Sequence, residues 1–216
     1  LVAIAKVPGM VITLGTMYIF RGINILWAGT KRINASQMSP DFLAFGNSQV
    51  FGIPSLTILA VLVATIAGWS LYSFRSGREL YAIGSAPEAA ELYGLAVNRR
   101  ALVSFVISGA MAGLAGVMFA ARYGTIASNA GTGYELQAIG AAVIGGVAIT
   151  GGVGTVAGAA FGAFLLATIN SALPVLGIES LWQRAVVGAL ILAAIILDRV
   201  LAVRQKRRLI AERMEP

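Results

Sequence analysis

Residues 99–122 read RRALVSFVISGAMAGLAGVMFAAR, and no charged residue lies between Arg100 and Arg122. A helix needs about 20 apolar residues to cross the hydrocarbon core of a bilayer. Arginines at both ends of such a run are typical of the two membrane interfaces. The stretch therefore predicts a transmembrane helix at residues 101–121.

Three more segments resemble this one in length. Residues 53–74 contain no charge, residues 7–27 contain Arg21 near their end and Trp27 as an interfacial anchor, and residues 181–197 qualify with Arg184 near one interface. A longer run, 136–178, contains no charged residue and exceeds the length of one span. It breaks at the glycine cluster TGGVGT, residues 150–155, which favours a turn. We expect a short helix at 136–149, a fuller one at 155–173, and then a loop marked by Pro174 and Gly177.

The composition agrees with a lipid environment. The chain has 216 residues, of which 58% are hydrophobic and 12% charged, with a mean hydropathy of +0.84. Soluble domains carry about 25% charged residues. There is no cysteine and no histidine, which excludes disulfides, thiolate metal sites and the usual general base. The formal net charge of +7 comes from basic residues at the ends of apolar runs, a pattern of membrane topology and not of nucleic-acid binding.

The basic residues predict the orientation. Four arginines lie within residues 75–100, and six basic residues follow Asp198 in the tail 199–216. Both segments are expected in the cytoplasm. Residues 136–173 must then begin and end outside, as two passes or as a re-entrant hairpin. Lys31 and Arg32 oppose this assignment, because they fall in a loop, 28–53, that is expected outside.

The expected fold is all-α: a polytopic transmembrane helical bundle with about six spans or half-spans. Residues 1–216 form a single transmembrane domain, with a cytoplasmic loop at 75–100 and a basic cytoplasmic tail at 199–216. The chain begins LVAIAK without methionine, and we expect it to be a piece of a longer membrane protein that has further N-terminal spans. Gly109-x-x-x-Gly113 and Gly158-x-x-x-Gly162 favour close packing of helices within the chain over a dedicated dimer face.

The polar interruption between two spans, ELYAIGSAPEAAELYGLAVNRR at residues 79–100, contains a second set of signals. Ser85 and Glu88 have the spacing of a capping box, and Pro87 suits a first helical turn. Gly94 can take the left-handed conformation that ends a helix. The pattern predicts a helix at 86–93, about 12 Å long. The residues alone leave two roles open for this helix: docking of a soluble partner, or a plain interfacial connection between spans.

The motifs resemble those of a known family. Glu88-Ala89-Ala90-x-x-x-Gly94 resembles the EAA-x-x-x-G loop of ABC importer permeases. Further blocks are similar to the ribose-type sugar permeases of the branched-chain-type, binding-protein-dependent superfamily: VITLGT at 11–16, RELYAIG at 78–84, GLAVN at 94–98, AGTGYE at 130–135, AAVIGG at 141–146 and GGVGT at 151–155. Their order and spacing cover nearly the whole chain. The loop at 29–47 is most similar to the rhamnose and furanosyl autoinducer members.

The resemblance implies a transmembrane permease subunit of an ATP-driven importer for a monosaccharide, located in the bacterial inner membrane. The implied partners are an ABC ATPase subunit, a periplasmic sugar-binding protein and a second permease subunit, identical or related. The chain would bind no cofactor, because ATP would be bound by the ATPase. The residues predicted to couple to that ATPase are Ser85, Glu88, Ala89, Ala90, Glu91 and Gly94.

The predicted passage-lining residues are Gln137 and Asn170, because polar residues within the spans are scarce. Membrane lipids are a further expected partner, although a stop-transfer anchor is favoured over lipid binding for the basic tail. Gly152-Val-Gly154-Thr-Val-Ala157 matches a dinucleotide-binding pattern, but it lacks the βαβ context that the motif requires. No G-x-x-x-x-G-K-[ST] motif occurs, so the chain is not expected to cradle ATP phosphates.

Two alternatives remain at this point. An ATP-independent secondary carrier or facilitator would use a similar bundle without an ATPase. The spans 53–74 and 101–121 contain no ionisable residue, which disfavours proton coupling. A membrane enzyme is disfavoured because the sequence lacks a cluster of catalytic carboxylates, histidines or cysteines.

Overall fold

The computed structural model describes residues 9–29, 31–178 and parts of the stretch 182–196. The described chain is helical, apart from turns and a pair of two-residue strands, which confirms the all-α prediction. The long helices are α2 (Gly9–Ala28), α4 (Ser55–Ser73), α7 (Val97–Tyr123) and α9 (Val156–Val175). The shorter elements are η1 (Ala35–Gln37), α3 (Pro40–Asn47), β1 (Gln49–Val50), β2 (Ile53–Pro54), α5 (Arg75–Ser85), α6 (Pro87–Leu92) and α8 (Tyr134–Ile144).

The four long helices are long and apolar enough to cross a membrane. They confirm the spans predicted at 7–27, 53–74, 101–121 and 155–173, with ends shifted by a few residues. Helix α7 has 27 residues, or about 40 Å at 1.5 Å per residue, which exceeds the roughly 30 Å hydrocarbon core. The span predicted at 181–197 and the basic tail at 199–216 lie outside the continuously described residues.

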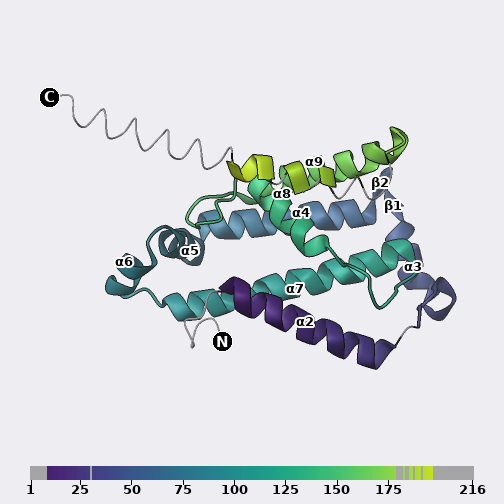
Figure 1. Cartoon of the computed structure of the whole chain (residues 1–216), viewed down its shortest axis with the longest axis horizontal. Helices are drawn as coiled ribbons and strands as arrows, with labels where there is room; N and C mark the ends of the chain where they lie inside the picture. The colour runs from purple at the N-terminus through teal and green to yellow at the C-terminus, as the bar shows by residue number, and fades with distance from the viewer. Residues whose placement is uncertain are drawn as a thin grey trace. The chain divides into compact units, whose positions relative to one another are not determined.

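The chain divides into two units, described here separately. Unit 1 contains the described parts of residues 1–63 together with 88–132, and unit 2 contains 64–87 with the described parts of 133–216. Figure 1 labels the elements of each unit. Helix α4 begins in unit 1 and ends in unit 2, and the second boundary falls within α6.

In unit 1, the segment predicted as a plain outer loop, 28–53, is folded onto the C-terminal end of α7. Helix α3 contacts α7 so closely that a Cβ added at Gly46 would overlap the carbonyl of Ala121. Ile33 and Ile126 exchange two backbone hydrogen bonds of 3.0 and 2.9 Å. Arg122, in the last turn of α7, donates to the side-chain oxygen of Asn47 at 3.2 Å. These hydrogen bonds fix the C-terminal end of α7 to the segment 33–47.

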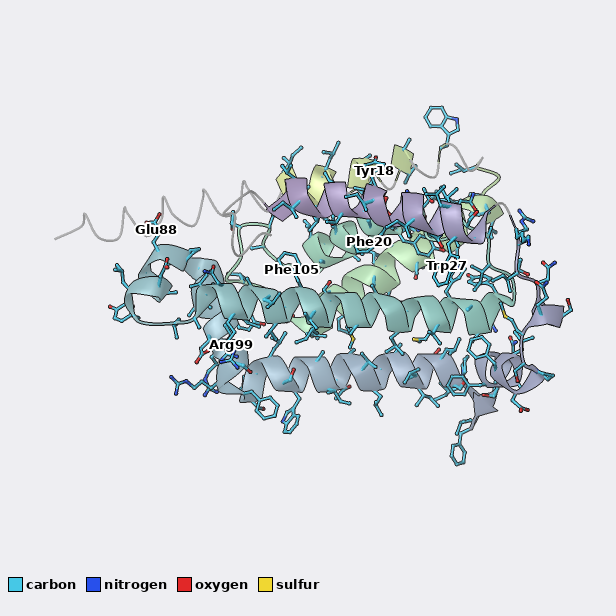
Figure 2. The ribbon with its side chains drawn as sticks, turned by 90° about the horizontal axis from the view of Figure 1, so that it is seen from below. Tyr18, Phe20, Trp27, Glu88, Arg99 and Phe105 are labelled. Atoms are coloured by element: carbon cyan, nitrogen blue, oxygen red, sulfur yellow. The ribbon has the colours of Figure 1, made fainter. Side chains whose placement is uncertain are left out.

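Unit 1 has arginines at both ends of α7, because Arg99 lies in its first turn and Arg122 in its last. Figure 2 shows Arg99 at the N-terminal end of α7, beside α6, and Trp27 towards the other end. Tyr18, Phe20 and Trp27 on α2 are 67%, 70% and 90% exposed. Exposed aromatic residues on a span suit contact with lipid or with another membrane chain, and tryptophan favours the interface. The orientation with α6 on the cytoplasmic side stays a prediction.

In unit 2, α8 and α9 pack against each other through glycine. A Cβ added at Gly145 would overlap the carbonyl of Gly158, and one added at Gly162 would overlap the carbonyl of Ala141. The paired positions run in opposite directions along the two helices, so the helices are antiparallel. Leu166, 3% exposed, packs with Ala141 and Ile144. The prediction of packing within the chain is confirmed for Gly158-x-x-x-Gly162. It is wrong for Gly109-x-x-x-Gly113 on α7, because a Cβ added at either glycine would have no described residue of another element within 4 Å.

The α8–α9 connection differs in detail from the prediction. Helix α8 ends at Ile144 and not at residue 149, because Gly146 adopts φ +82° and the amides of Gly146 and Val147 bond back to Val143 and Ala142. This is a Schellman ending, which satisfies the last carbonyl groups of the helix. Pro174 lies inside α9 and not in a following loop.

Helix α9 ends two residues later than predicted, at Val175, and a second Schellman ending at Gly177 closes it. Since α8 has only 11 residues, it is shorter than a full span.

Candidate functional site

The polar segment between α4 and α7 contains two helices where the sequence predicted one. Helix α5 begins at Arg75, directly after Phe74, which takes an extended conformation. The reversal from α4 is tight, since a Cβ added at Gly77 would overlap the carbonyl of Leu71. Arg75 Nε and Glu79 Oε1 lie 2.9 Å apart, an i,i+4 ion pair on the surface of α5. Such exposed pairs add only a few tenths of a kcal/mol, about 0.3–0.5.

The predicted capping box at Ser85 and Glu88 is wrong. Ser85 is the last residue of α5, and its hydroxyl donates to the carbonyl of Tyr81 at 2.9 Å. Helix α6 begins at Pro87, so the residue before it is Ala86. Proline restricts the residue that precedes it to extended conformations, and Ala86 has φ −153° and ψ 84°. The break between the helices is therefore set by Pro87.

The end of α6 is formed as predicted. Gly94 has φ +76°, which is the left-handed conformation. The amide of Gly94 donates to the carbonyl of Glu91, and the amide of Leu95 donates to the carbonyl of Ala90, each at 3.0 Å. These two bonds define a Schellman ending. The helix has six residues and not the predicted eight.

The exposed face of α6 differs from the alanine face that the sequence favoured. Ala90 is 5% exposed, so it is covered by the protein itself. Leu92 and Tyr93 are 89% and 88% exposed. Figure 2 shows the side chain of Glu88 directed away from α7. Sequence reasoning missed Leu92 and Tyr93, although two adjacent apolar residues in a polar loop were the available signal.

In unit 2, the glycine turn at 151–154 packs against the end of α5. The hydroxyl of Tyr81 donates to the carbonyl of Gly154 at 2.8 Å. A Cβ at Gly84 would overlap the backbone nitrogen of Gly152, and a Cβ at Gly152 would lie 2.8 Å from the backbone of Ser85. We call this contact the glycine seam: Tyr81, Gly84 and Ser85 on α5 against Gly151, Gly152 and Gly154.

The glycine seam explains the pattern that resembled a dinucleotide-binding motif. The turn follows helix α8 and not a strand, and Gly151 and Gly152 have φ of +89° and +78°. Their missing side chains are what lets α5 approach. A cavity of about 340 Å³ borders the seam. The side chains of Leu71, Leu80 and Val147 line this cavity and do not fill it. The seam is therefore held by backbone contact and by the Tyr81 hydrogen bond.

The predicted passage residues lie at the other end of the α8–α9 pair. Gln137 is exposed in the first turns of α8, and Asn170 is half-buried in the last turns of α9. The pairing of Ala141 with Gly162, continued by one helical turn, places Gln137 opposite Leu166. Both polar residues are therefore at the end of unit 2 away from the glycine turn. Their role in a passage stays a prediction.

Comparison with known proteins decides the family. The family model described as branched-chain amino acid transport system / permease component matches residues 1–195. The chain belongs to this permease family. The resemblance to ribose-type ABC permeases is thereby confirmed. No solved structure matches the chain.

Curated relatives agree with the family assignment. The autoinducer 2 import system permease protein LsrC of Klebsiella pneumoniae subsp. pneumoniae is 36% identical over 215 residues, covering 98% of this chain and 62% of the relative. The LsrC proteins of Enterobacter sp. strain 638 and Escherichia coli O9:H4 strain HS are each 35% identical, covering 98% and 97% of this chain and 62% and 60% of the relatives. The chain thus spans about three fifths of the length of these proteins.

The described residues contain no group of three or more acidic, histidine or cysteine side chains that could hold a metal ion. The family consists of membrane subunits that conduct a solute and do not transform it. The permease is accordingly a multi-pass membrane protein, in agreement with its long apolar helices.

Proposed function

We propose that the permease is the membrane subunit of an ATP-driven importer in the bacterial inner membrane, and that α6 is the element on which a separate ATPase subunit docks. The observation that supports this most strongly is the geometry of α6. It is a short helix at the arginine-rich end of α7, it ends at a left-handed Gly94, and it exposes Leu92 and Tyr93. An isolated helix of six residues is marginal in water, so a partner would stabilise it.

The proposed substrate is a small sugar or a furanosyl signalling molecule. The named relatives import autoinducer 2, and the sequence blocks are those of ribose-type permeases. A periplasmic binding protein would deliver the solute, and a second permease subunit would complete the passage. ATP would be bound by the ATPase partner and not by this chain. Gln137 and Asn170 are the proposed polar contacts of the solute on this chain.

A cysteine cross-link tests the docking of α6. The chain has no native cysteine, so Glu88→Cys provides a single thiol on the exposed side of α6. Ala90, another of the predicted coupling residues, is unsuitable because it is buried. In native membranes, we expect Glu88→Cys to form a disulfide with a cysteine in the groove of the ATPase, with a yield that changes when ATP is added. Transport that continues without ATP, together with no cross-link at this position, would support the carrier alternative.

Replacement of Gly94 by aspartate is expected to reduce transport by about two- to fivefold. Aspartate tolerates the left-handed conformation about as well as asparagine, so the main cost is the negative charge at a helix C-terminus, about 0.3–1 kcal/mol. This cost falls on the end of α6. The check is uptake of radiolabelled ribose or autoinducer 2, normalised to the amount of permease in the membrane.

Membrane insertion should be unchanged in this variant, since the loop at 94 is exposed. Gly94→Asn, a residue that tolerates the left-handed conformation and adds no charge, is the matched control and should keep most of the activity. Normal uptake by Gly94→Asp would remove Gly94 from the proposed coupling element.

A further inference from the structure

The glycine seam connects the proposed docking element to the α8–α9 pair. It lies entirely within unit 2, where Tyr81 and Gly154 are 73 residues apart in sequence and joined by a 2.8 Å hydrogen bond. Gly84 and Gly152 meet backbone to backbone. Neither Gly84 nor Gly152 has a side chain that could change rotamer to absorb a displacement at this half-buried contact. The seam is thus a stiff contact between α5 and the turn that joins α8 and α9.

The link from the seam to α6 is also stiff. Ser85, the last residue of α5, is separated from α6 by Ala86 alone. Pro87 has a fixed φ, and it restricts the conformation of Ala86 before it. The covalent connection from α5 to α6 is therefore one residue long and has a restricted backbone.

The α8–α9 pair continues this rigid path. Gly145 and Gly158 are in backbone contact, and so are Gly162 and Ala141. The carbonyl of Thr155 accepts from the amide of Ala159, and its side chain accepts from the amide of Gly158, which fixes the start of α9 to the turn. Movement of the turn would therefore move both helices together.

We infer that the glycine seam is a transmission contact, through which α6 moves the α8–α9 pair, and that Tyr81, Gly84 and Gly152 are the positioning residues of this contact. The inference rests on the proposed function, because it requires an ATPase that displaces α6. It adds a second route to that function: force reaches the membrane through α5 and the glycine turn, in addition to the direct chain connection from α6 into α7.

The test uses two reporter cysteines in the whole protein, assembled with its ATPase in inverted membrane vesicles. Glu88→Cys reports on α6, and Ile149→Cys reports on the glycine turn, where Ile149 is 56% exposed. The rate of labelling by a membrane-impermeant maleimide is measured without nucleotide and with ATP plus vanadate. No transported substrate is needed. We expect nucleotide to change the labelling rate several-fold at both positions.

Variants of the seam separate transmission from docking. Tyr81→Phe removes the hydroxyl and keeps the ring, and Gly84→Ala adds a Cβ that overlaps Gly152. In either background, we expect the nucleotide effect at Ile149→Cys to fall below about twofold, as expected from loss of one buried hydrogen bond or from overpacking, while the effect at Glu88→Cys persists. Alanine has a higher helix propensity than glycine, so Gly84→Ala would stabilise α5 if nothing packed against it. A loss of response in this variant therefore cannot come from a weaker helix.

Matched controls are available in the same unit. Tyr72→Phe removes a hydroxyl for which the described residues show no hydrogen bond, from a side chain that is 85% exposed. Gly68→Ala adds a Cβ at an ordinary contact of 3.6 Å from Val156. Both should retain the full nucleotide response at Ile149→Cys. If the Gly84→Ala protein does not accumulate in the membrane, Tyr81→Phe still tests the role of the seam.

The outcomes are distinct. A response at Glu88→Cys with none at Ile149→Cys would overturn the transmission contact and leave the proposed function intact. An undiminished response at Ile149→Cys in both Tyr81→Phe and Gly84→Ala would overturn the role of the seam residues. An absence of response at Glu88→Cys would remove the proposed function and this inference with it.

Discussion

Replacement of Gly162 by leucine should prevent α8 and α9 from pairing and remove most of the permease from the membrane fraction. A Cβ at this position would overlap the carbonyl of Ala141 and lie 2.8 Å from the backbone nitrogen of Gly145. Because both neighbours are backbone atoms, the strain cannot be relieved by a change of rotamer. Overpacking of a well-packed interior costs about 1–3 kcal/mol, and a full leucine against backbone should exceed about 3 kcal/mol. Total stabilities are about 5–15 kcal/mol.

The measurement is the amount of tagged permease in the membrane and its unfolding temperature in detergent. Gly162→Ala should fall between wild type and Gly162→Leu. Gly68→Ala is the control, since its added Cβ makes only an ordinary contact. Wild-type levels and an unchanged unfolding temperature for Gly162→Leu would show that α8 and α9 do not pack as the structure describes.

Replacement of Leu92 by aspartate should weaken the ATPase complex without affecting the membrane domain. The side chain is 89% exposed, so its loss removes no packing within the described chain. If α6 docks in a groove, burying a leucine side chain contributes about 1.5–3 kcal/mol, and placing a carboxylate there adds a desolvation cost. Association should therefore weaken by tenfold or more, with a parallel loss of transport. Co-purification of the ATPase with detergent-solubilised permease measures this directly.

Phe51→Asp is the matched control for this variant. Phe51 is 101% exposed at the turn between β1 and β2, in the segment expected outside, and its φ of 53° suits aspartate at least as well as phenylalanine. It should leave the association with the ATPase unchanged. If Leu92→Asp retained the ATPase as well as Phe51→Asp does, α6 would not be the docking element.

The sequence predicted the four spans because their signal is local: each is an apolar run of about 20 residues with at most one charge. It predicted the left-handed Gly94 for the same reason, since few residues other than glycine adopt that conformation. The packing of Gly158 and Gly162 was also predicted, although their partners on α8 were not. What these features share is that the residues involved are close in sequence.

The features that the sequence missed have two causes: contacts between distant residues, and local bonds that competed with the predicted ones. Residues 75–85 contain an apolar run of only four residues, 80–83, and α5 is tied to the rest of unit 2 by the hydrogen bond from Tyr81 to Gly154. The capping-box prediction failed because the Ser85 hydroxyl bonds within α5, one turn back. The exposed face of α6 was misjudged because its start at Pro87 sets which residues point outward, and Ala90 turns inward.

Pro174 has no amide hydrogen, so the carbonyl oxygen of Asn170 lacks the donor that an uninterrupted α9 would supply. In hydrocarbon, an unsatisfied carbonyl costs several kcal/mol, and such groups occur where water or a polar neighbour reaches them. The end of α9 that carries Asn170 should therefore be hydrated even at membrane depth. The length of α9 that would stay dry in a membrane is then shorter than its 20 residues.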